Sequence, residues 1–414
     1  MKVKIKKGYI GAQIAVIIFS LYAFSQLAWG NLIPTYLWLV LLTFALGLLF
    51  LNSYKSIKID SIIILSMTML VISIVWNNYE IAKYGIGIEI YIVMIFIFFW
   101  LAYNNNRWHS AFLTMMRLCG VFYTVFTYIC IIFPKFYTKN IYPIFSFLGY
   151  DFDNKAGFTS NYGTNGIFMC TGICAFTAVL LFNTERKVKK IDFVWLLFLL
   201  VGMLICGKRG QTIAVLFSIF VCYYFYNCNK KKGRFMKLIL VLIISIIAIY
   251  IISLFFPEVL TIVMRFQEQS VKGDISTGRF TMWKSAYALF LQKPWIGHGW
   301  RSFKFTIYSI DNYDVHNVFL QLLEEVGIIG SIPFYIFILI NFIKAVQLMI
   351  KIRKTDEKCV YTKYISVSVI YETFFICMCA TGTAYYQIEY LFTYFMCCAL
   401  IHYYSKQKEY DDKN

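Results

Sequence analysis

Long apolar runs dominate this sequence and restrict what the chain can fold into. The chain has 414 residues, of which 60% are hydrophobic and 14% charged, and its mean hydropathy is +0.66. Soluble domains contain about 45–50% apolar residues, and a helix needs about 20 to cross the hydrocarbon core of a bilayer. The apolar runs lie at about 9–28, 33–51, 60–76, 84–103, 111–133, 162–182, 191–206, 211–227, 236–256, 316–342, 364–383 and 385–404. They predict an all-α polytopic membrane protein with about twelve transmembrane helices.

The distribution of basic residues predicts how these helices are oriented. With the N-terminus in the cytoplasm, the short inner segments hold 25 of the 39 Lys and Arg residues. This asymmetry follows the positive-inside rule and places both termini in the cytoplasm. Most of the net charge of +18 is then a topogenic signal, so it does not indicate nucleic-acid binding. We read the first run as a retained span and not a signal peptide, because eleven further runs follow it.

Two outer segments are long enough to carry function, and the longer is 257–315, between spans nine and ten. We expect one integral membrane domain over 1–414, with 257–315 inserted as an extracytoplasmic loop. A helix is predicted inside this loop, capped by Ser276 or Thr277 and ended by Pro294. One face of that helix is aromatic, which suits a position on the membrane surface. Its aromatic residues are Phe280, Trp283, Tyr287 and Phe290.

Lys208 and Arg209 lie between two glycines in a short outer turn, against the positive-inside trend. A buried arginine at bilayer depth costs about 2.5–3.5 kcal/mol, so the pair needs an interface, a partner or a cavity. One interpretation is a pair of side chains that extend to the membrane interface. The other is an anion site, because Gly207 and Gly210 allow close backbone approach and the next helix presents its N-terminus.

The long loop and the following span contain further candidates. Arg279 and Arg301 are either solvated loop charges or ligands for an anion. His298 lies in a glycine-containing turn, and His316 lies at the outer mouth of the tenth run, where Asn317 can cap the helix. Two carboxylates, Glu324 and Glu325, follow inside an apolar stretch. A carboxylate at membrane depth is by default a functional candidate, although it can equally pair with an arginine for structure.

Taken in order, these stretches resemble the O-antigen ligase and polymerase superfamily of bacterial envelope glycosyltransferases. The stretches are GKRGQTIAVLF at a helix start, STGRFTMWKSAYALFLQKPWIGHG in the long outer loop and HNVFLQLLEEVGIIG at the next helix. GFTSNYGTNGIF, which contains Asn165, also resembles an outer-loop motif of that superfamily. The resemblance covers roughly residues 150–345 by motif and the whole chain by topology, and it implies a GT-C-like architecture.

The resemblance implies a donor glycan carried on undecaprenyl diphosphate at the outer face of the bacterial inner membrane. It assigns diphosphate stabilisation to Arg209 and Arg279, and activation of the acceptor hydroxyl to His316. The substrate-binding candidates are Lys208, Asn165, Arg301, His298, Asn317 and Glu324. The sequence has Lys208 where a serine or threonine is common in the superfamily.

No metal or cofactor is expected. The outer aspartates are scattered and form none of the acidic motifs of metal-using lipid-donor glycosyltransferases. A chain-length regulator protein is a further partner that the resemblance allows, beside the bilayer and the lipid-linked donor.

Three activities remain open. A polymerase of the Wzy type joins lipid-linked repeat units into O-antigen or capsular polysaccharide. A ligase passes the finished glycan to a lipid A core or to protein. We favour the polymerase, since richness in Ile, Phe, Tyr and Lys is typical of surface-polysaccharide gene clusters. A lipid-linked oligosaccharide flippase is the third possibility, but flippases usually have two related halves and short outer loops.

Overall fold

The structure, a computed structural model, is helical wherever it describes regular elements. It describes residues 8–54, 59–76, 86–149, 155–182, 190–227, 278–306, 309, 314–354 and 361–411. These residues form no β-strand; Ala28 and Thr159 form an isolated antiparallel bridge. The predicted all-α class is therefore confirmed.

The long helices coincide with the predicted apolar runs. They are α1 (Gly8–Ala23), α2 (Thr35–Ser53), α3 (Ser61–Val75), α5 (Ile86–Ala102), α6 (His109–Ile132), α9 (Tyr162–Phe182), α10 (Lys190–Cys206), α11 (Arg209–Tyr226), α15 (Val318–Lys354), α16 (Thr362–Thr381) and α17 (Ile388–Asp411). The run at 236–256 lies outside the described residues. Shorter elements are η1 (Trp29–Leu32), α7 (Pro134–Asn140), α8 (Tyr142–Phe147), α14 (Arg279–Gln292), η3 (Phe303–Phe305) and η5 (Ala384–Tyr386).

Among the described residues, five helices are long and apolar enough to cross a membrane. They are α2, α6, α9, residues 318–352 of α15, and α16. Shorter apolar helices lie at Ile10–Ala23, Ser61–Val75 and Ile90–Ala102. The chain is thus a multi-pass membrane protein. The layout of twelve spans stays a prediction, because the ninth run and the first part of the long loop lie outside the described residues.

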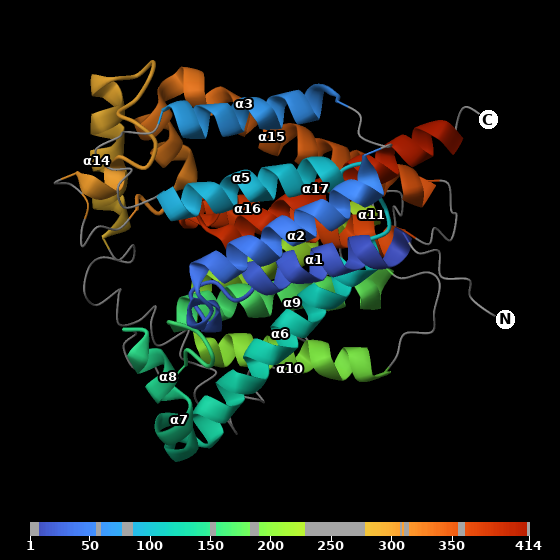
Figure 1. The fold of residues 1–414 in the computed structure, drawn as a ribbon, viewed down its shortest axis with the longest axis vertical. Helices are drawn as coiled ribbons and strands as arrows, with labels where there is room; N and C mark the ends of the chain where they lie inside the picture. Colours follow the sequence, from blue (N-terminus) through green and yellow to red (C-terminus); the bar gives the residue numbers. More distant parts are fainter. Residues whose placement is uncertain are drawn as a thin grey trace.

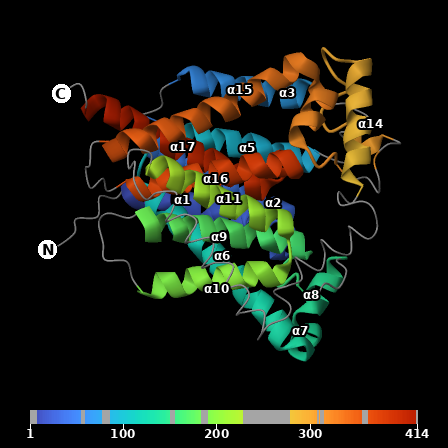
Figure 2. The ribbon, with the colours of Figure 1, turned by 180° about the vertical axis from the view of Figure 1, so that it is seen from behind.

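The long helices lie side by side, and the short ones gather at one end of the bundle (Figure 1). There α14 crosses the bundle almost at right angles to the long helices, and α7 and α8 lie at the same end. The beginning of α1 and the end of α17 lie at the opposite end (Figures 1 and 2). We call the first of these the α14 end. The arrangement agrees with a loop and two termini on opposite sides of a membrane.

A charged pair between two helices accounts for Arg117, an arginine that lies within an apolar run. Arg117 of α6 forms an ion pair with Asp192 of α10, and its guanidinium lies 4.4 Å from the centre of the Phe176 ring in α9. An arginine at membrane depth is satisfied by a carboxylate and an aromatic face. We assign Arg117 to the packing of α6, α9 and α10.

The helix α15 is broken near the α14 end. Gly327 has φ 65° and ψ −172°, which interrupts the helical hydrogen bonding. The segment between α14 and η3 replaces the missing partners. The amides of His298 and Gly299 donate to the carbonyls of Glu324 and Glu325 at 3.0 and 2.7 Å, and the Ile328 amide donates to Pro294 at 2.8 Å. The loop that carries α14 is therefore fastened to the break through its backbone.

This fastening predicts that Gly327 tolerates no side chain. A Cβ there would lie 2.4 Å from the carbonyl of Trp295, and its positive φ disfavours any L-residue. Gly327→Ala should lower the free energy of unfolding by about 1–3 kcal/mol. Thermal unfolding of detergent-solubilised protein measures the change. The matched control is Gly47→Ala in α2, where an added Cβ meets nothing within 4 Å; equal melting temperatures for the two variants would contradict the prediction.

Candidate functional site

The turn between α10 and α11 puts two cations at the start of a helix. Gly207 has φ 76°, and the Arg209 amide donates to its carbonyl at 3.2 Å. The chain therefore reverses within two residues, and α11 begins at Arg209 with Lys208 as its N-cap. A side chain at Gly210 would meet nothing within 4 Å, so the turn has open space beside it. Lys208 and Arg209 thus share the positive end of the α11 dipole.

Lys208 is fixed against the start of α9. Its ammonium lies 4.6 Å from the centre of the Tyr162 ring, a cation–π contact. A Cβ at Gly163 would lie 2.8 Å from Lys208 Cε, so glycine there leaves room for the lysine. Asn161 caps α9, since its Oδ1 accepts from the Gly163 and Thr164 amides at 2.8 and 3.0 Å. The predicted motif at 157–168 therefore packs against Lys208 through residues 161–163.

Arg279 enters the same region from the long loop. It is the first residue of α14, whose N-cap is Gly278 with φ 81° and no side-chain cap. The predicted caps, Ser276 and Thr277, lie outside the described residues. One guanidinium nitrogen donates to the Thr381 carbonyl at the end of α16, at 2.8 Å. Burial first, and then the nearby charge of Arg209, lower the pKa of Arg279. Two arginines therefore act on each other at the α14 end.

His316 completes the group from the segment before α15. It has φ 55°, in the left-handed region that few residues other than glycine adopt. Burial lowers the pKa of His316 to about 4, helped by the charges of Arg279 and Lys208 and opposed by Asp314. This value lies well below the ordinary histidine pKa of about 6.5. The imidazole is neutral at neutral pH, chiefly because it is buried and secondarily because of the Arg279 and Lys208 charges. We define Lys208, Arg209 and Arg279 as the basic cluster.

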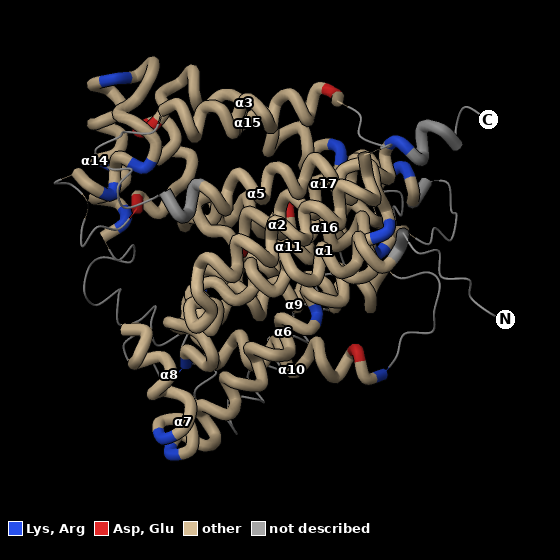
Figure 3. Tube along the Cα trace, viewed as in Figure 1, with Lys and Arg blue, Asp and Glu red and all other residues tan. Residues whose placement is uncertain are grey.

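The three residues predicted as catalytic therefore come together at the α14 end, although they lie on three different elements. Figure 3 shows Lys and Arg concentrated at the two ends of the bundle, with some of those at the α14 end on and around α14. The basic cluster joins the starts of α11 and α14, and His316, two residues before α15, interacts electrostatically with Arg279 and Lys208 of the cluster. The geometry offers fixed cations beside a neutral imidazole, an arrangement that can bind an anion and accept a proton.

Three of the predicted substrate-binding residues have structural contacts. Asn165 donates from its side-chain amide to Thr127 at 2.6 Å and to the Lys155 carbonyl at 2.9 Å, which ties the outer loop to α6. Asn317 caps α15, with its Oδ1 accepting from the Leu320 amide at 3.1 Å. His298 lies 3.0 Å from the Leu289 carbonyl and so donates to the end of α14. These contacts position the elements that carry the cluster.

The carboxylates of α15 lie in a buried polar network. Glu324 and Glu325 are both fully buried. Glu324 accepts from the Ser302 hydroxyl at 3.2 Å, while Glu325 accepts from Gln321 at 2.8 Å and from the Tyr386 hydroxyl at 2.7 Å. Their partners are hydroxyl and amide groups, so the predicted alternative of a carboxylate–arginine pair is not seen in these contacts.

Arg301, the remaining predicted binding residue, has φ 60° and follows the buried Trp300. The Arg301 charge interacts with the Tyr386 side chain. Arg301 therefore lies near the polar network around Glu325.

Sequence reasoning missed several residues of this site. Asn161 carried a signal, since an asparagine immediately before a helical run is a typical N-cap. Tyr162 and Thr381 carried none, because an aromatic residue and a threonine at helix ends are common, and only the fold brings them to Lys208 and Arg279.

A multi-pass α-helical membrane protein with arginines, a lysine and a histidine gathered at one end of its bundle is the class that the fold and the site define. Residues 193–335 match the family described as O-antigen ligase (Wzy_C). The match runs from α10 into α15 and includes the basic cluster and His316. It covers about a third of the chain and confirms the resemblance to the O-antigen ligase-like superfamily predicted from the motifs. Comparison with curated proteins gave no match.

Proposed function

We propose that this protein is a bacterial envelope glycosyltransferase that polymerises oligosaccharide repeat units carried on undecaprenyl diphosphate. The observation that carries the proposal is the convergence of Arg209, Arg279 and His316 from three elements at the α14 end. An acceptor sugar hydroxyl attacks the anomeric carbon of the donor glycan and forms the new glycosidic bond. The bond from that carbon to the lipid diphosphate breaks, and its electron pair leaves with the diphosphate.

The basic cluster stabilises the leaving group. Negative charge grows on the diphosphate as the sugar bond breaks, and the two guanidinium groups present planar forks that match phosphate oxygens. Burial and then the charge of Arg209 lower the pKa of Arg279, so the two guanidinium groups repel each other. A diphosphate between them removes this repulsion. Fixed cations of this kind cost no reorganisation during the reaction.

His316 accepts the proton of the attacking hydroxyl. Burial, and after it the Arg279 and Lys208 charges, lower the pKa of His316, which weakens the imidazole as a base. Diphosphate bound to the basic cluster offsets these charges and raises the pKa of His316 toward its ordinary value. The imidazole therefore becomes a better base when the donor is in place, which couples proton transfer to donor binding.

A ligase is the second candidate, and the family description favours it. In that reaction the acceptor is a lipid A core or a protein in place of another repeat unit. Glycan analysis of a deletion strain distinguishes the two. Polymerase loss leaves surface molecules with a single repeat unit, whereas ligase loss leaves long chains on the lipid carrier. Repeat units retained inside the cell would contradict both and indicate a flippase.

We place the protein in the bacterial inner membrane, with both termini in the cytoplasm and the α14 end facing outward. Two exposed lysines test this orientation. Lys293 directly follows α14, and Lys351 lies near the far end of α15. In intact spheroplasts, a membrane-impermeant maleimide should label Lys293→Cys and leave Lys351→Cys unlabelled until the membrane is opened. The parent chain gives the background from native cysteines. The reverse pattern would contradict both the orientation and a site that faces outward.

A further inference from the structure

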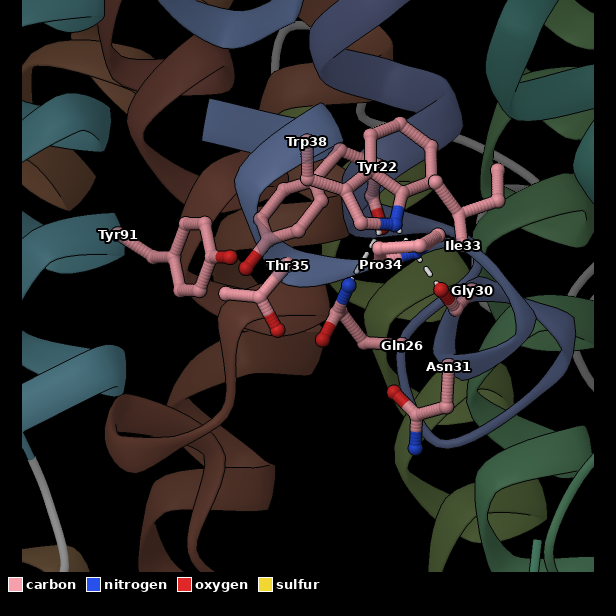
Figure 4. A pocket seen from close by; sticks show the side chains of 9 residues that line it. All are labelled: Tyr22, Gln26, Gly30, Asn31, Ile33, Pro34, Thr35, Trp38 and Tyr91. Carbon is pink, nitrogen blue, oxygen red and sulfur yellow. Dashed lines mark hydrogen bonds between the residues drawn. The ribbon is translucent and has the colours of Figure 1, made fainter. Parts of the chain in front are cut away.

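A cavity lies between the end of α1 and the start of α2, beside α5 (Figure 4). Its volume is about 240 Å³. Part of the lining comes from the loop that joins α1 to α2 and contains η1. The lining residues are Tyr22, Gln26, Gly30, Asn31, Ile33, Pro34, Thr35, Trp38 and Tyr91.

The cavity has an aromatic floor and a polar rim. Tyr22, Trp38 and Tyr91 are buried, with exposed fractions of 2%, 5% and 8%. The Tyr22 ring lies 5.2 Å from Trp38 in an edge-on arrangement and 4.6 Å from Tyr91. Asn31 and Thr35 on the rim are exposed. The lining contains no Lys, Arg, Asp, Glu or His, so its chemistry suits a neutral ligand with hydroxyl groups and an apolar face.

Local contacts hold the cavity in this shape. The Trp38 indole donates to the Gly30 carbonyl at 2.9 Å, and the Gly30 amide donates to the Ser25 carbonyl at 2.9 Å. A Cβ at Gly30 would lie 2.4 Å from the Ser25 hydroxyl. Gln26 donates to the Tyr22 carbonyl at 3.2 Å. The loop is thus fastened to the helices on both sides, and the floor and rim keep fixed positions.

The same loop is joined to the basic cluster. The Ser160 amide donates to the Leu27 carbonyl at 2.7 Å, and Ala28 bridges to Thr159. The next residues are Asn161, which caps α9, and Tyr162, whose ring contacts Lys208. The chain therefore connects the cavity to the proposed diphosphate site through two paired segments at one end of the bundle.

We propose that this cavity is a subsite for one sugar unit of the glycan, an inference that rests on the proposed function. Sugars present an apolar C–H face, which packs on the electron-rich face of an aromatic ring, and hydroxyls, which hydrogen-bond to amide and hydroxyl side chains. A phosphate headgroup would need a cation that the lining lacks. A lipid chain would gain nothing from the polar rim. The subsite holds the glycan while its reacting end lies at the basic cluster.

Binding of free oligosaccharide to purified protein tests the subsite. The probe is the repeat-unit oligosaccharide released by mild acid from the lipid carrier of the native strain, which carries no diphosphate. Saturation-transfer NMR detects its binding. Thr35→Trp fills the cavity and should weaken binding at least about tenfold, as expected when a packed contact and a hydrogen bond are lost. Thr35→Leu, a smaller obstruction, should give an intermediate loss.

Leu37→Trp is the matched control, because it inserts the same side chain two residues later at an exposed position outside the lining. It should bind the probe as the wild type does. Equal binding by the two tryptophan variants, or no binding by a wild type that transfers glycan, would overturn the subsite alone. Arg279→Ala should keep probe binding while losing transfer. Probe binding without transfer from any lipid-linked donor by the wild type would overturn the proposed function and leave the subsite standing.

Discussion

Arg279→Ala should lower the rate of glycan transfer by about 10²–10³-fold, the loss typical when a fixed donor to a developing negative charge is removed. The half-buried guanidinium lies near Arg209 and is held by the Thr381 carbonyl. Arg209→Lys should also impair transfer although it keeps the charge, because an ammonium cannot make the two-point contact of a guanidinium. Turnover of purified protein with a lipid-linked donor measures both.

Stability separates this role from a structural one. Arg279→Ala loses one hydrogen bond, worth about 0.5–1.5 kcal/mol, but it also relieves repulsion from Arg209. The melting temperature should therefore change little while transfer falls. Lys284→Ala is the matched control, since Lys284 is an exposed lysine on the same helix, and it should transfer at the wild-type rate. Polysaccharide of normal length in cells that express Arg279→Ala or Arg209→Lys at normal protein level would contradict a catalytic role. It would favour the alternative that these side chains extend to the membrane interface.

His316→Ala should lower transfer by about 10²–10⁴-fold, the range that a positioned general base contributes. Donor binding should persist, because the basic cluster remains. Asn317→Ala provides the contrast. It removes the cap of α15 and should lower stability by about 1 kcal/mol, with a far smaller effect on turnover per folded molecule. A His316→Ala enzyme that turns over near the wild-type rate would exclude His316 from the mechanism.

The lowered pKa of His316 also predicts the pH dependence. His316 must be neutral to accept a proton, so activity falls as pH falls through its pKa. For the free enzyme that pKa is about 4, and kcat/KM should stay flat well below pH 6.5. In the donor complex the diphosphate offsets the positive charges of Arg279 and Lys208. The fall of kcat at low pH should therefore occur at a higher pH than the fall of kcat/KM. If kcat and kcat/KM fell at the same pH, the result would contradict coupling between donor binding and the pKa of His316.

The same shift affects folding stability. Because the folded-state pKa lies below the unfolded value, the unfolded chain binds more protons between about pH 4 and 6.5. Stability contributed through His316 is therefore fully present above pH 6.5 and decreases as pH falls toward 4.

The local sequence carried enough information for the long helices and for some of the site. An apolar run of span length has few stable alternatives, since a bilayer satisfies no free backbone group, and α9 begins and ends where the pattern predicts. The cap at Asn317 also follows from local chemistry alone. The spacing of Arg209, Arg279 and His316 identified them as candidates through a family resemblance.

The sequence by itself determined the helical membrane class and the residues able to bind an anion, because hydrophobic length and side-chain type are local properties. Only the tertiary structure decided which of those residues meet. Their separations in the chain say nothing about distance, so the approach of Arg279 to Arg209 and the contact of Lys208 with Tyr162 depend on how the helices pack. The break at Gly327 and the pKa of His316 have the same origin. The first requires backbone partners from Pro294–Gly299, and the second requires burial beside charges from two other elements.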